Sequence, residues 1–155
     1  MSAFYLDSSA VVKRYVPENG TAWIADITNP VRRHTIMTAE ITTAEVTAAI
    51  AAKHRAPKGI TRQERDDAVN IFLQHCNTEY QLVHLNRIIL ARATHLTQNH
   101  RLRGYDAVQL ATAFVINNVL TTSGFDDFTF VSADNDLIVA AKSEGLSTDN
   151  PNLYL

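Results

Sequence analysis

Several common architectural devices are missing from this sequence of 155 residues. It holds one cysteine, Cys76, which excludes an intramolecular disulfide and favours a cytoplasmic location. No apolar stretch approaches the roughly 18 residues of a membrane-spanning helix, and Met1 to Asp7 lacks the basic and apolar regions of a secretory signal. The sequence contains no linker or low-complexity tract, so we expect residues 1–155 to form a single domain.

A strong excess of charge of one sign is also missing. The 14 Lys and Arg residues nearly balance the 16 Asp and Glu residues, which excludes a histone-like polycation. The charges are nevertheless unevenly distributed, because residues 104–155 carry a single basic residue, Lys142, among seven acidic ones. This excess of acidic residues at one end of the chain calls for an explanation.

What the sequence does contain is an alternation of short apolar runs and helical patterns. The runs predicted as strands are 4–6, 34–37, 80–83 and 128–131. The predicted helices span 10–16, 21–27, 38–55 (capped by Thr38), 61–77, 86–99, 105–117 and about 134–145. A polar loop is expected at 118–127. This alternation predicts an α/β fold in which a short, mostly parallel sheet is covered by helices on both faces, a three-layer α/β/α arrangement.

Two acidic residues follow predicted strands directly. Asp7 comes after the first strand and Asp134 comes shortly after the last, so both belong at the edge of the sheet where parallel folds bind ligands. Each is also a favoured helix N-cap residue, which is the simpler interpretation. Asp136 lies about 200° around the helix from Asp134, and only one of the two can face a given site.

Two further acids lie on helices. Glu45 shares a helix face with Ile41, Ala49 and other apolar residues, and a carboxylate in such a stripe needs a partner, a metal or a proton unless it reaches solvent. Asp106 opens the most apolar helix of the chain, where an acid also complements the helix dipole.

Taken together, these acids predict a metal site. Carboxylates from four separate segments repel one another unless a cation holds them. Mg²⁺ and Mn²⁺ prefer oxygen ligands, and sites of this kind carry out phosphodiester chemistry.

Four motifs match a known family. They are YLDSSA at 5–10, TAEV at 43–46, LRGYDAVQLATA at 102–113 and FVSADNDL at 130–137. In this order and spacing the chain resembles PIN-domain nucleases, most closely the toxins of VapBC-type toxin–antitoxin modules. The resemblance covers nearly the whole chain.

The resemblance implies an α/β/α fold and a Mg²⁺- or Mn²⁺-dependent endoribonuclease, with Asp7, Glu45, Asp106 and Asp134 as its catalytic, metal-binding residues. Asp7 and Asp106 would be the main ligands. Asp134 would complete the coordination directly or through water, while Glu45 would orient the attacking water. The residues expected to support these acids are Ser8, Ser9 and Ser132, with Asp136 able to replace or assist Asp134.

Partners follow from the same resemblance. It implies RNA as the substrate, an antitoxin protein as the partner, and a homodimer or larger toxin–antitoxin assembly. Lys13, Arg14 and Arg103 are candidates for contacting RNA, although basic clusters are more often ordinary solvated surface. The alternatives are an RNA-processing nuclease without a toxin role and a catalytically silent RNA- or protein-binding module. A phosphatase on another α/β fold is disfavoured because Asp7 does not begin an Asp-x-Asp motif.

Overall fold

The computed structural model describes residues 1–155 and confirms the α/β/α architecture. Its strands are β1 (Ala3–Leu6), β2 (Thr35–Ala39), β3 (Gln81–Val83), β4 (Phe128–Val131) and β5 (Thr148–Asp149). Its helices are α1 (Ser8–Val11), α2 (Thr21–Ile27), α3 (Thr42–Arg55), α4 (Arg62–Thr78), α5 (Arg87–Asn99), α6 (Gly104–Thr122) and α7 (Asn135–Ser143). None of the helices is both long enough and apolar enough to cross a membrane.

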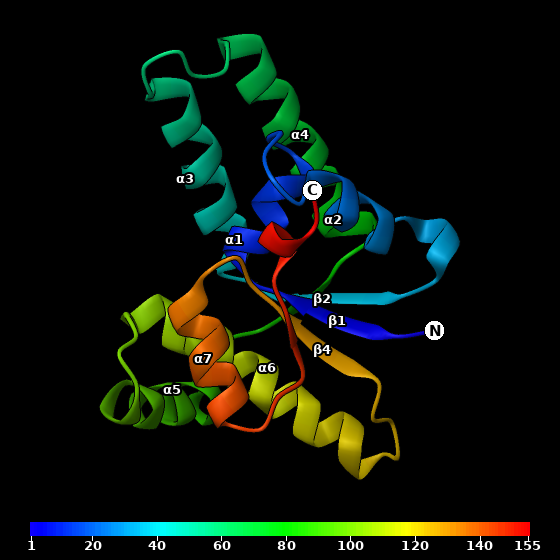
Figure 1. Cartoon of the computed structure of the whole chain (residues 1–155), viewed down its shortest axis with the longest axis vertical. Coiled ribbons are helices and arrows are strands. Elements are labelled where there is room, and N and C mark those ends of the chain that lie inside the picture. The colour runs from blue at the N-terminus through cyan, green and yellow to red at the C-terminus, as the bar shows by residue number, and fades with distance from the viewer.

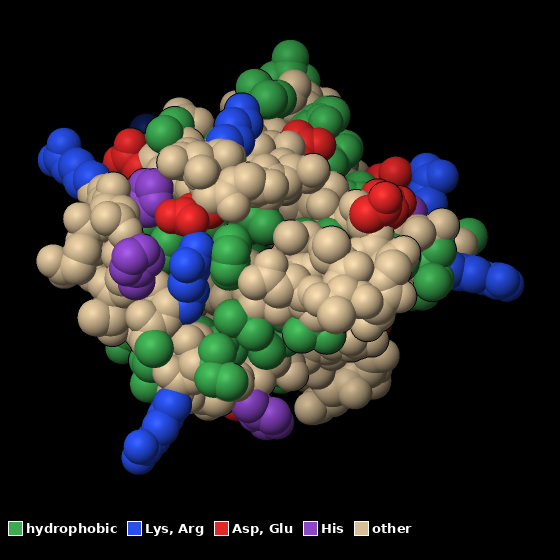
Figure 2. Space-filling model, turned by 90° about the horizontal axis from the view of Figure 1, so that it is seen from below, with side chains coloured by type: hydrophobic (Ala, Val, Ile, Leu, Met, Phe, Trp, Pro, Cys, Tyr) green, Lys and Arg blue, Asp and Glu red, His purple; other side chains and the backbone are tan.

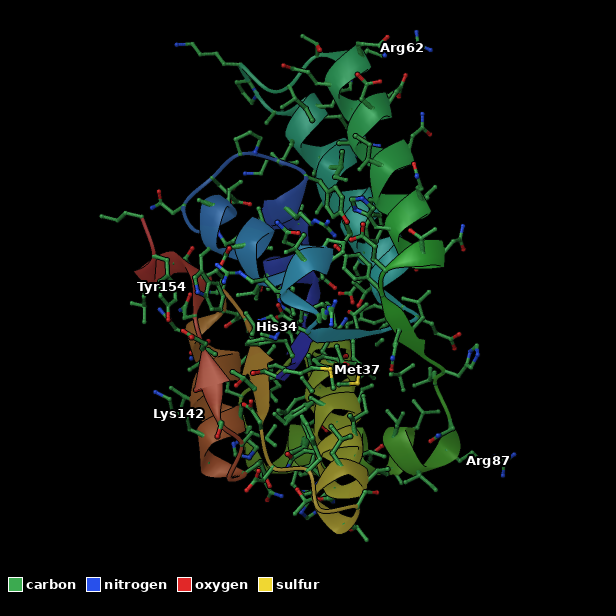
Figure 3. All side chains as sticks on the ribbon, turned by 90° about the vertical axis from the view of Figure 1, so that its right-hand side faces the viewer. His34, Met37, Arg62, Arg87, Lys142 and Tyr154 are labelled. Atoms are coloured by element: carbon green, nitrogen blue, oxygen red, sulfur yellow. The ribbon has the colours of Figure 1, made fainter.

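The five strands form one parallel sheet in the order β3-β2-β1-β4-β5. Helices α1 to α4 cover one face and α5 to α7 cover the other, so the sheet is the middle layer (Figure 1). Figure 3 shows the same layers from the side, with Arg62 and Lys142 on opposite helical layers. β1 lies at the centre, and the carboxyl ends of β1 and β4 are therefore neighbours.

Each face of the sheet has its own apolar core because alternate residues of a strand point to opposite sides. In β1, Tyr5 packs with Phe130, Leu96 and Leu110 beneath α5, α6 and α7. The next residue, Leu6, belongs to the other core, which includes Ile50 and Phe72. β1 is thereby covered on both faces, as a central parallel strand requires.

Local capping chemistry sets several helix boundaries as the sequence predicts. Thr61 and Glu64 form a reciprocal capping box at the start of α4, and the Asn86 side chain accepts a hydrogen bond from Ile89 N at the start of α5. Gly145 follows α7 with φ of +85°, the left-handed conformation that glycine adopts without strain.

Three local predictions were wrong. Thr38 is not a helix cap but part of β2, where its hydroxyl donates to the Leu6 carbonyl, and α3 begins only at Thr42. The expected loop at 118–127 begins later, because α6 continues through Thr122. The first helix is shorter than predicted, since α1 changes at Val12 into a turn of 3₁₀ helix.

Candidate active site

Asp7 is the most tightly held of the predicted acids. It caps α1 directly after β1, and 3% of its surface is exposed. Its Oδ1 accepts hydrogen bonds from Ser9 Oγ at 2.7 Å and Ala10 N at 3.0 Å, while Oδ2 accepts one from Ser132 Oγ at 2.6 Å. The capping role and the site position are therefore not alternatives, because one carboxylate fulfils both.

Burial dominates the electrostatics of Asp7. Loss of solvent raises the pKa of its carboxyl to about 6, and the Asp106 charge adds to the rise. The three hydrogen bonds to the carboxylate act in the opposite direction and limit the shift. Asp7 is thus a buried acid with no cationic partner.

Asp134 occupies the corresponding position after β4. Its Oδ1 caps α7 by accepting hydrogen bonds from the backbone N–H groups of Asp136 and Leu137. The preceding loop is joined to the β1 loop, since Ala133 N donates to Ser9 Oγ at 2.9 Å. Ser9 and Ser132 therefore connect the loops that follow β1 and β4. The Asp136 side chain is exposed.

Glu45 enters the site from α3 and is half-buried. Its Oε1 accepts a hydrogen bond from Ser8 Oγ at 2.9 Å and another from Gln109 Nε2 at 2.8 Å. Glu45 therefore has the polar partners that the sequence predicts it to need. Both are neutral, so neither compensates the negative charge of the carboxylate.

Gln109 also lines the cavity site, although the sequence alone did not indicate a role for it. It is 2% exposed, its Oε1 accepts from Tyr5 Oη at 2.6 Å, and its Nε2 also lies 2.9 Å from Thr42 Oγ1. The available signal was a polar residue one turn after Asp106 within an otherwise apolar helix. Gln109 ties α6 to β1 and α3, and thereby fixes Glu45.

We expect Gln109→Leu to lower the free energy of unfolding by about 2–3 kcal/mol. The substitution leaves the buried Tyr5 hydroxyl without its acceptor and removes one of the two hydrogen bonds to Glu45 Oε1, and such losses are costly. Urea denaturation of the variant tests this, with Gln98→Leu on the exposed face of α5 as the control. Equal stability of Gln109→Leu and the unmodified protein would contradict the structural role.

Asp106 lies in the first turn of α6, half-buried. Burial raises the pKa of its carboxyl, and the charges of Asp134 and Glu45 raise it further, against a lowering effect of Arg103. The pKa of Asp106 thus responds to Glu45 and Asp134, and the pKa of Asp7 responds to Asp106, which places the four acids in one electrostatic cluster.

A shared cavity brings these acids together. A cavity of about 260 Å³ is lined by Val12, Ala49 and polar residues from the end of β1, α1, α3, α6 and the loop after β4: Asp7, Ser8, Ser9, Glu45, Asp106, Gln109 and Asp134. A second cavity of about 760 Å³ shares Glu45, Asp106 and Asp134 and adds Asp136 to its lining. Asp134 thus lines both spaces, whereas Asp136 reaches only the larger one.

The donor set suits a hard divalent cation in its chemistry. Every ionisable group in the smaller cavity is a carboxylate, and the pKa values of Asp7 and Asp106 are raised, first by burial and further by neighbouring carboxylates. No three His, Cys, Asp or Glu side chains lie close enough together to form a metal centre by themselves. Binding therefore needs a small inward movement of the acids or water in the remaining positions, which Mg²⁺ usually retains.

The basic residues named from the sequence separate in the structure. Lys13 is buried, and its Nζ donates to the Asn19 carbonyl at 2.8 Å. Arg14 pairs with Glu79 at 2.7 Å. Neither lines the two cavities, whereas Arg103 lines the larger one. Arg103 alone of these three stays a candidate for contacting a substrate.

Solved structures with the same fold come from toxin–antitoxin systems. VapBC2 of Rickettsia felis bound to a promoter DNA fragment superposes with a TM-score of 0.63 at 13% identity, covering 96% of this chain and 98% of that chain. Mycobacterium tuberculosis VapC20, described as a sarcin–ricin loop cleaving toxin, gives 0.58 at 16% identity over 88% and 94% of the two chains. A toxin–antitoxin complex from Klebsiella pneumoniae gives 0.57 at 16% identity over 97% and 98%.

These neighbours define the class of fold. The family model of the PIN domain matches residues 4–142, and the chain belongs to the PIN domain family. No curated protein sequence matches it.

Proposed function

We propose that this protein is a Mg²⁺- or Mn²⁺-dependent endoribonuclease in which residues 1–155 act as one PIN-like domain. The observation that carries the proposal is the convergence of Asp7, Glu45, Asp106 and Asp134 on one cavity without a cationic partner inside it. Such a cluster is unfavourable in itself, because burial and the neighbouring carboxylates both raise the pKa values of Asp7 and Asp106. A bound divalent cation relieves that repulsion.

Asp7 and Asp106 are the proposed main metal ligands, with Asp134 completing the set directly or through water. A divalent cation bound there would activate a water molecule and neutralise charge on the phosphodiester oxygens. Ser9 and Ser132 keep Asp7 in place, and Ser8 and Gln109 hold Glu45 where it can orient the attacking water. The family resemblance implies products with a 5′-phosphate and a 3′-hydroxyl.

The proposed biological role is that of a cytoplasmic toxin with a cognate antitoxin. The fold neighbours described as VapBC2 and as toxin–antitoxin complexes support this role, and the VapC20 description supports RNA as the substrate. A short upstream gene for a small DNA-binding protein would favour it over a general RNA-processing nuclease. A homodimer or a larger assembly with the antitoxin is part of the proposal.

Apolar surface on the lower helical layer supports binding of another protein. Hydrophobic side chains gather between isolated charged ones on this face (Figure 2). A groove of about 510 Å³ beside the larger cavity has a mostly apolar lining that includes Ile41, Leu90 and Tyr105. Leu90 is 45% exposed and Tyr105 is 68% exposed, so both can be covered by a partner.

The direct test is incubation of the purified chain, free of any partner, with RNA in Mn²⁺ and in EDTA. We expect cleavage only with the metal, because the cavity supplies carboxylates and no other group able to activate water. The products should carry 5′-phosphates, which is read from their sensitivity to a 5′-monophosphate-dependent exonuclease. Equal survival of RNA in Mn²⁺ and EDTA would refute the nuclease and favour the silent binding module.

A further inference from the structure

The larger cavity beside the acids has a second wall of a different character. One side carries the acidic residues Glu45, Asp106, Asp134 and Asp136. The other is the segment between α5 and α6, from which His100, Arg101 and Arg103 line the same space. Arg101 and Arg103 are exposed, whereas 15% of the His100 side chain is exposed. His100 is therefore the one basic side chain of this wall that the fold holds in place.

A chain of contacts fixes the His100 ring. Its Nε2 lies 2.8 Å from Glu144 Oε1, and Glu144 Oε2 accepts from Arg92 Nη2 at 2.8 Å. The Arg92 guanidinium stacks 3.9 Å above the centre of the Phe114 ring. Contacts with α5, α6 and the end of α7 thus hold the His100 imidazole in place at the cavity.

The Glu144 contact determines what the other ring nitrogen can do. A carboxylate only accepts hydrogen bonds, so Nε2 carries the proton. Arg92 pairs with the same carboxylate at 2.8 Å. In the tautomer that carries its proton on Nε2, Nδ1 is an acceptor, and it makes no hydrogen bond within the protein. The fold presents a fixed acceptor at a cavity whose lining also contains four carboxylates.

We propose that His100 Nδ1 accepts a hydrogen bond from a ribose 2′-hydroxyl of the substrate, and that His100 is a residue that selects RNA over DNA. The inference rests on the proposed nuclease function. The 2′-hydroxyl is the only hydrogen-bond donor on an RNA sugar–phosphate backbone, and DNA has none. Phosphates offer only acceptors, and Arg101 and Arg103 on the same wall suit them.

The test compares binding of an oligouridylate and the oligo-2′-deoxyuridylate of equal length, measured by fluorescence anisotropy in EDTA so that nothing is cleaved. These probes share their bases and differ only in the 2′-hydroxyl. The unmodified protein should bind the RNA more tightly. His100→Leu should weaken RNA binding about three- to tenfold, the range of one hydrogen bond, and leave DNA binding unchanged. His95→Leu, on the exposed face of α5, is the matched control.

Two conservative variants separate substrate contact from a purely structural clamp. The amide of Asn can replace Nδ1, whereas the longer Gln side chain can replace Nε2 and its contact with Glu144. We expect His100→Asn to keep the RNA preference and His100→Gln to lose it. The reverse order, or equal weakening of RNA and DNA binding, would overturn the proposal, with thermal melting confirming that each variant is folded.

The behaviour of the unmodified protein distinguishes failure of the His100 proposal from failure of the nuclease proposal. If it cleaves RNA in Mn²⁺ yet binds both probes equally, the role of His100 is wrong and the nuclease stands. If it neither cleaves RNA nor binds either probe, both proposals fail.

Discussion

Asp106→Asn is expected to reduce RNA cleavage about 10³-fold or more in Mn²⁺ while the protein stays folded. The substitution removes the negative charge from the acid that opens α6, at the point where the charges of Glu45 and Asp134 meet. Loss of a proposed principal metal ligand is expected to remove several kcal/mol of transition-state stabilisation. The shape of the side chain is unchanged, and the half-buried position tolerates an amide. Single-turnover cleavage rates at saturating protein measure the effect.

Asp136→Asn is the matched control for this prediction. It makes the same chemical change in the larger cavity, but Asp136 is exposed and does not line the smaller cavity. We expect at most a severalfold effect on the rate. Asp134→Asn, in contrast, should be strongly impaired while α7 stays capped, because Asn caps a helix as well as Asp. A large loss in Asp136→Asn with little in Asp134→Asn would exchange their roles.

Asp7→Asn is expected to stabilise the metal-free protein by about 3 kcal/mol at pH 8, although it abolishes activity. The native pKa of Asp7 is raised to about 6 from an ordinary value of 3.8. A raised carboxyl pKa favours folding at pH values below the unfolded pKa, and this contribution is lost as the pH rises from about 4 to about 6. Above that range the folded protein carries a buried, unpaired charge, which the amide removes.

Urea denaturation in EDTA at pH 4 and pH 8 measures this effect. The difference between Asp7→Asn and the unmodified protein should be near zero at pH 4 and largest at pH 8. Asp126→Asn, at an exposed position in the loop before β4, should show no difference at either pH. A destabilised Asp7→Asn at pH 8 would mean that the hydrogen bonds from Ser9 and Ser132 outweigh the cost of burying the charge.

Addition of metal should make the unmodified protein more stable than Asp7→Asn. A ligand that binds only the folded state stabilises it by about 4.1 kcal/mol at a concentration of 1,000 times its Kd, which exceeds the expected advantage of Asp7→Asn. Mn²⁺ should therefore raise the Tm of the unmodified protein at pH 8 and have little effect on Asp7→Asn. The same acid then limits the stability of the empty fold and supports that of the metal-bound one.

Much of the fold follows from local sequence. Apolar runs predict four of the five strands, and three of these, β2, β1 and β4, are interior parallel strands whose two faces are both covered. The capping residues at Thr61, Asn86 and Gly145 set helix boundaries through contacts within a few residues. β5 is not predicted because a strand of two residues is too short to show an alternating apolar pattern. It forms only by pairing with β4.

The sequence by itself determined which acids to consider, since Asp7 and Asp134 follow strands and Asp106 opens a buried helix. It could not decide between capping and site roles, and the tertiary structure makes the two compatible because the carboxylates that cap helices also line the cavity. Only tertiary structure removed Lys13 and Arg14 from the candidate site, because their partners Asn19 and Glu79 are brought to them by folding. The contacts that make Gln109 and His100 candidate site residues also form only on folding, because their partners lie far away along the chain.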